Sequence, residues 1–414
     1  MTATKLQQPI CGDPPDANGH YKRMPSRFRS DIPSKEFPAE RDRYVLYINH
    51  CCPWAHRTII VHALKGLGDI VQMVEVDARD PTHGWYFSGH RGPSRDPVHG
   101  IRWMKELYLK ADPHYNGRVT IPLLWDKKHH TIVNNESSEI MRMFIAGFDE
   151  ILPVKKREAS KGVAAFIPEH LRDQIDHFNA WVYDIVNNGV YKVGFATTQA
   201  AYNEHVVRLF QAFDRLEQHL SELDHQPFLF GLYITEPDIR LYTTLIRFDV
   251  AYYTLFKCNL KMVRTDYPRL HAWLRRLYWS EGPETGGGVF KKTTFFDVVT
   301  VKNGISPPGH DLLRKNPSGY DFHRPALRVS NCSVAFHFRK SKLMFTQDSL
   351  EKLIQFAEDH RIAHPVKTLE FVLVAFPTRK MHQLYGAAFT PWQNQGIADI
   401  MNRTRAEFVD NGQH

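Results

Sequence analysis

A cysteine followed by a proline stands where a buried strand gives way to a helix. Residues 44–48 form an apolar run that predicts a strand, and apolar residues from Thr58 onward predict a helix. Proline suits the first helical position, so Pro53 places Cys52 at the N-terminal end of that helix. Unpaired backbone N–H groups and the helix dipole favour a thiolate there. Cys52 is therefore the candidate nucleophile.

The residue three positions after this cysteine predicts its chemistry. Ala55 stands where a dithiol oxidoreductase carries the second cysteine of a Cys-x-x-Cys motif. A mixed disulfide on Cys52 would therefore need an external thiol to resolve it, and glutathione is the obvious cellular thiol. Cys51 could resolve it only through a strained disulfide between adjacent residues. A buried structural cysteine is the alternative interpretation of a Cys-Pro pair taken alone.

Composition excludes several classes of protein. A chain of 414 residues with 43% hydrophobic and 24% charged residues predicts two or three globular domains. It has neither an apolar run of the roughly 18 residues that span a bilayer nor a leader-like start, so we expect a cytoplasmic protein without membrane segments. Five dispersed cysteines predict no disulfide framework and no metal site. The net charge of +8 is spread among acidic residues, which argues against nucleic-acid binding.

The segments that follow the predicted helix contain one long irregular stretch. Residues 69–76 predict a second strand, parallel to the first. Residues 80–113 carry many glycines and prolines and predict a long loop. Trp85, within that loop, has two interpretations: it anchors the loop on the core, or it offers an aromatic surface to a substrate.

A proline inside an apolar run marks the next candidate site. Residues 117–125 predict a strand, although Pro122 is tolerated there only at an edge, at the first residue or in a cis turn. In a thioredoxin-like domain a cis-proline at this point would expose the backbone of Ile121 to a peptide-like ligand. At the next predicted helix start, the Ser137 hydroxyl and free N–H groups could hold a ligand carboxylate, and Glu136 could pair with a ligand amino group. Simple helix capping is the alternative.

The helical half of the chain is predicted from its periodicity. Apolar residues three or four apart over 168–188 predict an amphipathic helix, which residues 187–189 are expected to end. Tyr191 would then lie on the connection, where a half-buried tyrosine bonded to backbone is its structural interpretation. Thr235, with Asp238 three residues later, predicts a capped helix start and a structural role for the carboxylate.

Four motifs follow one another along the chain: Cys52-Pro53-Trp54-Ala55-His56-Arg57, RVTIP at 118–122, NNESSE at 134–139 and VNNGVYK at 186–192. Together they resemble the glutathionyl-hydroquinone reductases, the Xi class of glutathione transferases, over about residues 21–309. The resemblance implies a thioredoxin-like α/β domain, an all-helical C-terminal domain and a homodimer. It also implies reduction of glutathionyl-hydroquinones: the cysteine attacks the glutathione sulfur, releases the hydroquinone and is regenerated by a second glutathione.

The resemblance also assigns roles to individual residues. It implies that Cys52 is the nucleophile and that Tyr191 points its hydroxyl at the quinol oxygen. Residues that resemble the glutathione site are Trp85, Arg118, Ile121, Glu136 and Ser137. Glutathione is the implied co-substrate, and no metal is implied. The expected segments are a lead segment at 1–40, a thioredoxin-like domain at 41–150, a helical domain at 165–310 and an extension at 311–414.

Two features depart from the family and keep alternatives open. Residues 290–297 stand where family members carry a tyrosine of the quinol pocket, and they contain none. The extension could be a small α/β unit, a packing module or a sequence that does not fold. One alternative function is an omega-class-like thioltransferase or dehydroascorbate reductase, against which Trp85 and Tyr191 argue. The other is a non-catalytic glutathione-binding or ligand-binding protein, against which the intact site argues through Cys52, Arg118, Glu136 and Ser137.

Overall fold

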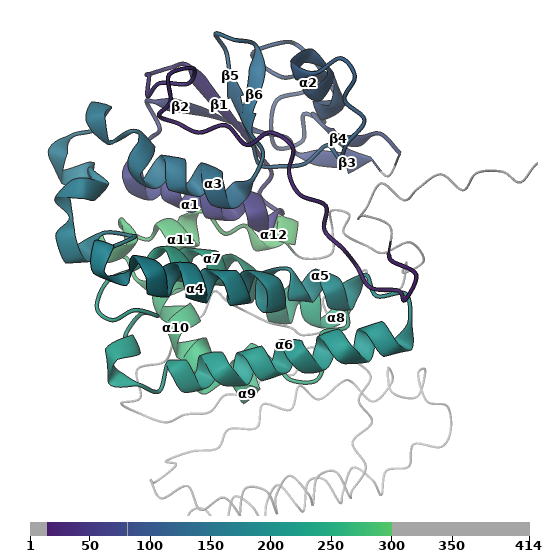
Figure 1. Cartoon of the computed structure of the whole chain (residues 1–414), viewed down its shortest axis with the longest axis vertical. Coiled ribbons are helices and arrows are strands. Elements are labelled where there is room, and N and C mark those ends of the chain that lie inside the picture. The colour runs from purple at the N-terminus through teal and green to yellow at the C-terminus, as the bar shows by residue number, and fades with distance from the viewer. Residues whose placement is uncertain (1–14, 81, 300–414) are drawn as a thin grey trace, which may run out of the picture. The chain divides into compact units, whose positions relative to one another are not determined.

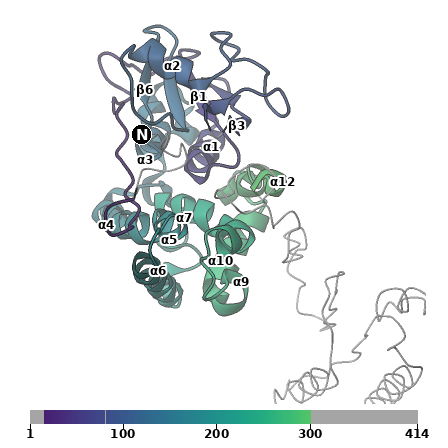
Figure 2. The same cartoon turned by 90° about the vertical axis from the view of Figure 1, so that its right-hand side faces the viewer.

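The computed structural model describes residues 15–80 and 82–299. They form an α/β domain followed by a helical domain, which confirms the predicted fold class for this part of the chain (Figures 1 and 2). The predicted extension at 311–414 lies outside the described residues. Across the described part of the chain, no helix is long and apolar enough to cross a membrane.

A four-stranded mixed sheet forms the first domain, in the order β2-β1-β5-β6. The central strand β1 runs parallel to β2 and antiparallel to β5, so the predicted strand–helix–parallel strand unit is confirmed. All five residues of β1 are buried. The helices α1 and α3 lie between the sheet and the helical domain (Figure 1). The bounds are β1 (Tyr44–Ile48), α1 (Pro53–Lys65), β2 (Val71–Glu75), β5 (Leu123–Asp126), β6 (Thr131–Asn134) and α3 (Ser137–Arg142).

The long loop predicted at 80–113 is confirmed only for residues 87–102, which form no helix or strand, because regular elements lie on both sides of them. β4 (Gly84–Tyr86) pairs with β3 (Ala78–Asp80) in a hairpin, and α2 (Met104–Ala111) follows. The Asp80 carboxylate accepts the backbone N–H groups of Thr82 and His83 in the hairpin turn, which holds the turn. Local capping of this kind orders a stretch whose glycine and proline content predicts a loop.

The strand predicted at 117–125 is shorter than expected. The chain becomes a strand only at Leu123, after Pro122, and the Ile121–Pro122 peptide bond is cis. Proline has no backbone N–H to donate to a neighbouring strand, and the residues up to Pro122 lie outside the sheet. The cis turn predicted as one of three possibilities is therefore the one observed.

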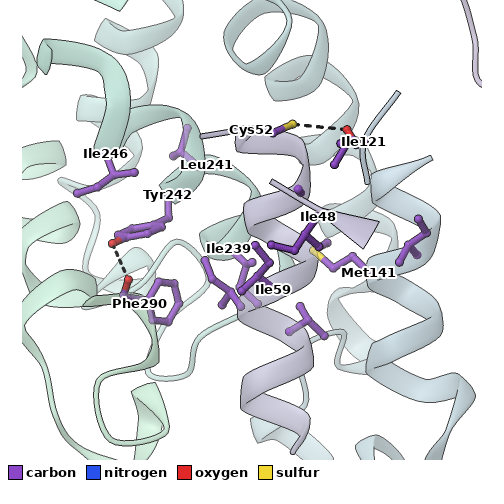
Figure 3. Close-up of a cluster of buried hydrophobic side chains, with 14 of the residues drawn as sticks. Ile48, Cys52, Ile59, Ile121, Met141, Ile239, Leu241, Tyr242, Ile246 and Phe290 are labelled. Carbon is purple, nitrogen blue, oxygen red and sulfur yellow. Dashed lines mark hydrogen bonds between the residues drawn. The ribbon is translucent and has the colours of Figure 1, made fainter. Parts of the chain in front are cut away.

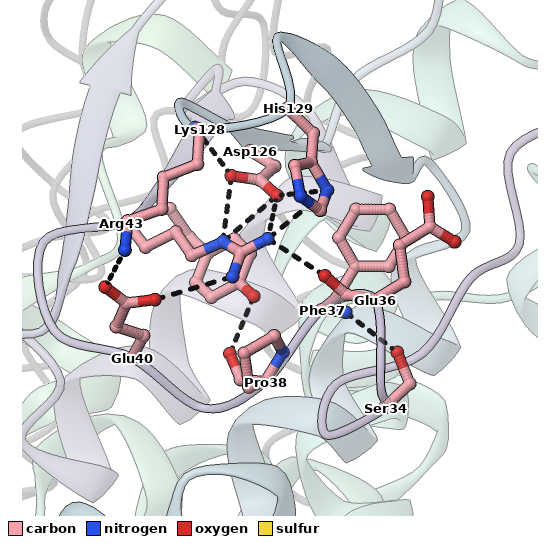
Figure 4. A network of polar contacts seen from close by, with 10 residues as sticks. Ser34, Glu36, Phe37, Pro38, Glu40, Arg43, Asp126, Lys128 and His129 are labelled. Carbon is pink, nitrogen blue, oxygen red and sulfur yellow. Dashed lines mark hydrogen bonds and ion pairs between the residues drawn. The ribbon is translucent and has the colours of Figure 1, made fainter.

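The lead segment is tied to both domains. Arg43, at the start of the sheet, pairs with the buried carboxylate of Asp126 at 2.5 Å and donates to the Glu36 carbonyl at 2.9 Å (Figure 4). Further towards the N-terminus, the Gly19 carbonyl accepts the Thr197 N–H of the helical domain at 3.0 Å. The segment 15–40 therefore runs as a strap from the helical domain to the sheet (Figure 1).

The helical domain is built around α7, all of whose residues are buried. Its N-terminus carries the predicted capping box of Thr235 and Asp238. Asp238 also accepts the Trp273 indole N–H at 2.8 Å, which confirms its structural role. The helices are α4 (Arg172–Val182), α5 (Gly189–Gly194), α6 (Gln199–His219), α7 (Glu236–Arg247), α8 (Tyr253–Leu255), α9 (Val263–Asp266), α10 (Pro268–Trp279), α11 (Val289–Lys292) and α12 (Phe296–Val299), with π-helical turns at Met143–Gly147, Tyr183–Asn187 and Phe248–Tyr252 and short 3-10 turns between 149 and 171.

The predicted helix end at 187–189 is wrong. Asn188 has φ −88° and ψ −23°, which is right-handed backbone, and the chain continues from a π-helical turn into α5. The Asn187 side chain donates to the Thr244 hydroxyl of α7 at 2.8 Å, so it is used for packing between helices and not for ending one. Tyr191 consequently lies inside α5 and not on a connection.

The two domains meet through an apolar contact between α1 and α7. Ile59 of α1 and Ile239 of α7 are both buried there, and Figure 3 shows them side by side. Cys52 lies at the top of the same helix α1, close to this interface (Figure 3). The packing of the domains therefore decides which groups of the helical domain reach the cysteine.

Candidate active site

Cys52 occupies the N-cap position of α1, and Pro53 is the first helical residue, as predicted. The side chain is 8% exposed. Its sulfur donates to the Ile121 carbonyl oxygen at 3.5 Å (Figure 3), while the backbone N–H groups of Trp54 and Ala55 interact with it. The structure therefore brings together the predicted nucleophile, the helix start and the residue before the cis-proline.

The electrostatic surroundings of Cys52 act in two directions. Burial raises the pKa of the thiol above its usual range and is the largest effect. The N–H groups of Ala55 and Trp54, followed by the guanidinium groups of Arg247 and Arg23, lower the pKa. The N–H groups predicted to favour a thiolate are thus present and lower the pKa, but the effect of burial outweighs them.

An aromatic cluster lies next to the cysteine. The Tyr191 ring stacks on the Trp54 ring at 5.8 Å and 30°. The Arg23 guanidinium lies 4.5 Å from the Trp54 ring centroid and 4.9 Å from that of Tyr191, and Arg23 also donates to the Asn188 amide oxygen at 2.9 Å. A cation over two ring faces is an attractive arrangement. These contacts fix Tyr191 against Trp54, which lies two residues after Cys52.

The Tyr191 hydroxyl is held in its protonated form. Burial raises its pKa well above the usual range, with Tyr252 and Cys52 adding to the effect and Arg23 opposing it. A side-chain contact with Tyr252 also raises the pKa of Tyr191 and lowers that of Tyr252. A neutral hydroxyl beside a sulfur can donate a hydrogen bond to an oxygen that gains negative charge.

Glu136 and Ser137 lie at the start of α3. Glu136 is the N-cap residue, and its carboxylate accepts the Ser138 N–H at 3.3 Å and the Ser26 hydroxyl at 3.1 Å. Its charge also acts on the pKa of Tyr183, at the boundary with the helical domain. Ser137 is buried. The capping role is therefore observed, while a role of either residue towards a ligand stays a prediction.

Trp85 and Arg118 lie in the same domain as Cys52. Trp85, on β4, packs against the hydrophobic core and lies under the Arg79 guanidinium at 5.5 Å. This contact agrees with its interpretation as an anchor. The Arg118 carbonyl accepts the Tyr115 hydroxyl at 2.6 Å, and its side chain is partly exposed. Their roles as ligand-binding residues stay predictions.

The segment at 290–297, which lacks a tyrosine, packs against the cysteine loop. The Phe295 ring lies 4.4 Å from the His50 ring, and Arg91 pairs with Asp297 at 2.6 Å. Burial, and then the charges of Arg91 and Arg247, lower the pKa of His50 to about 4. His50 is therefore neutral at neutral pH, and an aromatic ring without a hydroxyl covers it.

Within residues 15–80 and 82–299, no group of histidine, cysteine and acidic side chains is arranged to hold a metal ion. The buried sulfur, the tyrosine hydroxyl and the backbone of Ile121 are arranged for thiol chemistry. Such chemistry needs a second thiol, because Ala55 supplies none.

Comparisons with known proteins agree with this geometry. The family model described as glutathione S-transferase, N-terminal domain, matches residues 51–146, and that of the C-terminal domain matches residues 199–276. The glutathione S-transferase omega-like 2 of Schizosaccharomyces pombe is 47% identical over 284 residues, which cover 68% of this chain and 87% of that protein. The glutathionyl-hydroquinone reductase YqjG of Escherichia coli is 43% identical over 280 residues, covering 65% and 82%.

A solved structure of a related protein has a similar fold. The Xi glutathione transferase ECM4 from Saccharomyces cerevisiae in complex with glutathione matches with a TM-score of 0.66 and 36% identity, covering 75% of this chain and 100% of that one. This chain belongs to the Xi class of glutathione transferases, the glutathionyl-hydroquinone reductase family. The predicted family is confirmed.

Three residues around the cysteine of this Xi-class transferase escaped the sequence analysis: Arg23, Arg247 and Tyr252. Arg23 belongs to a lead segment without periodicity, and Tyr252 to an aromatic run that predicts only core. Arg247 carried a usable signal, because it follows the apolar Leu245-Ile246 pair and an arginine is almost never fully buried unless it is paired. The partner it pairs with could not be found from sequence spacing.

The electrostatics of Cys52 in this Xi-class transferase predict its reactivity. Since burial raises the pKa of the thiol, the Cys52 thiolate fraction at pH 7 should be smaller than that of an unfolded chain. We expect the rate of Cys52 alkylation by iodoacetamide, measured in a Cys51→Ala background, to keep rising with pH beyond the midpoint of the same cysteine in denatured protein. A midpoint below that of the denatured protein would contradict this account.

Proposed function

We propose that this chain reduces glutathionyl-hydroquinones to hydroquinones, with glutathione as the second substrate and glutathione disulfide as the other product. The observation that carries the proposal is a buried cysteine at a helix N-terminus whose charge acts on the protonated Tyr191, a residue that stacks on Trp54 two positions after the cysteine. The relative from Escherichia coli, which is 43% identical and is named a glutathionyl-hydroquinone reductase, supports the same chemistry.

The first step uses Cys52 as the nucleophile. Its thiolate attacks the sulfur of the conjugate, so that a disulfide between Cys52 and glutathione forms while the bond between sulfur and the quinol ring breaks. The conjugate reacts as its keto tautomer, whose ring carbon already carries a hydrogen. The electron pair of the broken bond therefore moves through the ring onto the adjacent oxygen, which takes a proton as the hydroquinone leaves. The N–H groups of Trp54 and Ala55 stabilise the attacking sulfur.

The second step regenerates the enzyme. The thiolate of a second glutathione attacks the glutathione sulfur of the mixed disulfide, and Cys52 leaves as thiolate together with glutathione disulfide. A resolving cysteine at position 55 is absent from the sequence, so external glutathione supplies this thiol. Cys51 is a poor substitute because burial raises its pKa to about 11.

The proposed glutathione site is built from the first domain. The Ile121 backbone, which lies beside the cysteine sulfur, would pair with the peptide part of glutathione. Glu136 and Ser137 would hold its amino and carboxylate groups at the start of α3, while Arg118 and Trp85 would complete the site. The structure of the yeast Xi transferase in complex with glutathione supports glutathione as the ligand. The homodimer implied by the resemblance, and the cytoplasmic location, stay predictions.

Tyr191 is the proposed electrophilic partner. Its protonated hydroxyl would donate to the quinol oxygen, which gains negative charge as the ring accepts the electron pair. The stacking of Tyr191 on Trp54 under Arg23 holds the ring in place for this contact. The same aromatic faces would pack against the quinol ring.

Removing the sulfur tests the nucleophile. We expect Cys52→Ser to lower turnover of the glutathione conjugate of menadiol, in excess glutathione, by about 1,000-fold or more, because a serine hydroxyl cannot form the disulfide. Glutathione binding measured by calorimetry should persist. Cys51→Ser is the matched control and should keep turnover within a few-fold. A Cys52→Ser protein that has also lost glutathione binding would mean that the site is misplaced.

Removing one hydroxyl tests the proposed role of Tyr191. We expect Tyr191→Phe to lower kcat roughly 10- to 100-fold, since one hydrogen bond to a developing negative charge is lost, while KM changes little. Tyr202→Phe is the control, because that hydroxyl lies on α6 and donates to the Lys257 carbonyl at 2.7 Å. Unchanged kinetics of Tyr191→Phe would remove this residue from the mechanism.

A further inference from the structure

Arg247, the last residue of α7, reaches across the domain interface to the cysteine loop. The side chain is 2% exposed. Its Nε donates to the Cys51 carbonyl at 3.1 Å and one Nη donates to the His50 carbonyl at 3.0 Å. The other Nη donates to the Thr243 carbonyl at 2.9 Å and contacts His56 Nδ1 at 2.9 Å. The guanidinium therefore holds the backbone of both residues that precede Cys52.

None of these four acceptors is a carboxylate, which distinguishes Arg247 from two other buried arginines, Arg43 and Arg240. Arg43 pairs with Asp126, and Arg240 pairs with Glu236 at 2.5 Å. Hydrogen bonds to carbonyl oxygens satisfy the N–H groups of Arg247, but they do not cancel its charge, and an isolated buried charge is costly. A negative charge close by would lower that cost.

The imidazole partner of Arg247 is neutral. Burial, followed by the charges of Arg247 and His50, keeps the pKa of His56 well below its usual range. Because an arginine N–H can only donate, Nδ1 of His56 accepts, and the proton of the neutral ring lies on Nε2. Nε2 then donates to the Thr293 hydroxyl at 3.1 Å, and Thr293 donates to the Val289 carbonyl at 2.8 Å. This chain of contacts links Arg247 to α11 without neutralising it.

The field of Arg247 acts on the groups around the cysteine. It lowers the pKa of the Cys52 and Cys51 thiols and of the Tyr252 hydroxyl, and it disfavours protonation of His50. Each direction is the one a nearby cation imposes. The titratable and charged groups that act on Cys52 or respond to its charge are Arg247 of α7, Arg23 of the lead segment, Tyr191 of α5, Tyr252 of the third π-helical turn and the adjacent Cys51.

We propose that Arg247 is a positioning residue for Cys52. It fixes the His50–Cys51 backbone against the helical domain and supplies a positive charge that stabilises the Cys52 thiolate. The formation of the thiolate comes before any chemistry, so this effect on the thiol does not depend on the substrate. Its consequence for turnover rests on the proposed function. Arg23 is the second cation, but it is held over Trp54 and Tyr191 and does not contact the loop backbone in any bond described above.

The test measures Cys52 itself in the full chain. All proteins carry Cys51→Ala, and iodoacetamide labelling of Cys52 is followed against pH on the tryptic peptide 44–57, which then contains no other cysteine. Arg247→Gln removes the charge while keeping an amide that can donate to the loop carbonyls. Arg247→Lys keeps the charge. Arg247→Met replaces the glutamine variant if the latter is too unstable, because it removes the same charge.

Two further variants separate charge from stability. His56→Leu removes the imidazole contact but leaves Arg247 its three carbonyl partners, so it should lower the thermal midpoint without moving the labelling midpoint. Arg208→Met removes an exposed arginine of α6 that pairs with Glu204, and it should change neither quantity. Thermal midpoints of every variant are recorded beside the labelling profiles.

The expected result is a specific loss of thiolate. Arg247→Gln should raise the labelling midpoint by about one pH unit or more, so that labelling at pH 7 falls about tenfold, whereas Arg247→Lys should shift it much less. An unchanged midpoint in folded Arg247→Gln would overturn the proposal. So would equal shifts in Arg247→Lys or His56→Leu, because the loss would then follow packing and not charge. If labelling shifts as expected while the wild type does not turn over the menadiol conjugate, the proposed function fails and this inference stands.

Discussion

The burial of the Cys52 sulfur is the constraint on which the rest of the site depends. A thiolate in an apolar pocket is disfavoured, and the raised pKa of Cys52 records that cost. The fold offsets it with backbone N–H groups at the start of α1 and with two guanidinium groups. Burial would also shield a mixed disulfide on Cys52 from water until a second glutathione binds and attacks it. The site therefore combines an unfavourable environment with several compensating contacts.

Those contacts come from parts of the chain that are far apart in sequence. The strap supplies Arg23, α5 supplies Tyr191, and α7 supplies Arg247, while the sheet domain supplies the cysteine and the Ile121 carbonyl. The site exists only when the two domains are packed through α1 and α7. This explains why α7 is buried along its length and capped by the Thr235–Asp238 pair, since a shift of this helix would move Arg247 away from the loop. Stability of the helical domain and reactivity of the cysteine are thus linked.

Local patterns predicted much of this arrangement. The position of Cys52, the parallel β1–β2 pair, the cis Ile121–Pro122 bond and the capping box follow from residue preferences that act over a few positions. The elements within 80–113 were missed because side-chain capping overrides a composition rich in glycine and proline. Tyr191 was misplaced because Asn187 uses its amide for packing on α7 instead of ending the helix. Arg247 and Tyr252 could not be placed at all, since only tertiary packing brings them to Cys52.

A single turnover without added glutathione tests the central claim most directly. The Cys51→Ala protein is mixed with an equimolar amount of the glutathione conjugate of menadiol, and the products are separated by mass. We expect one menadiol released per protein and one glutathionyl group on peptide 44–57, removed again when glutathione is added. Menadiol release with no glutathionyl group on Cys52, or a conjugate left intact by a folded protein that binds glutathione, would contradict the monothiol mechanism.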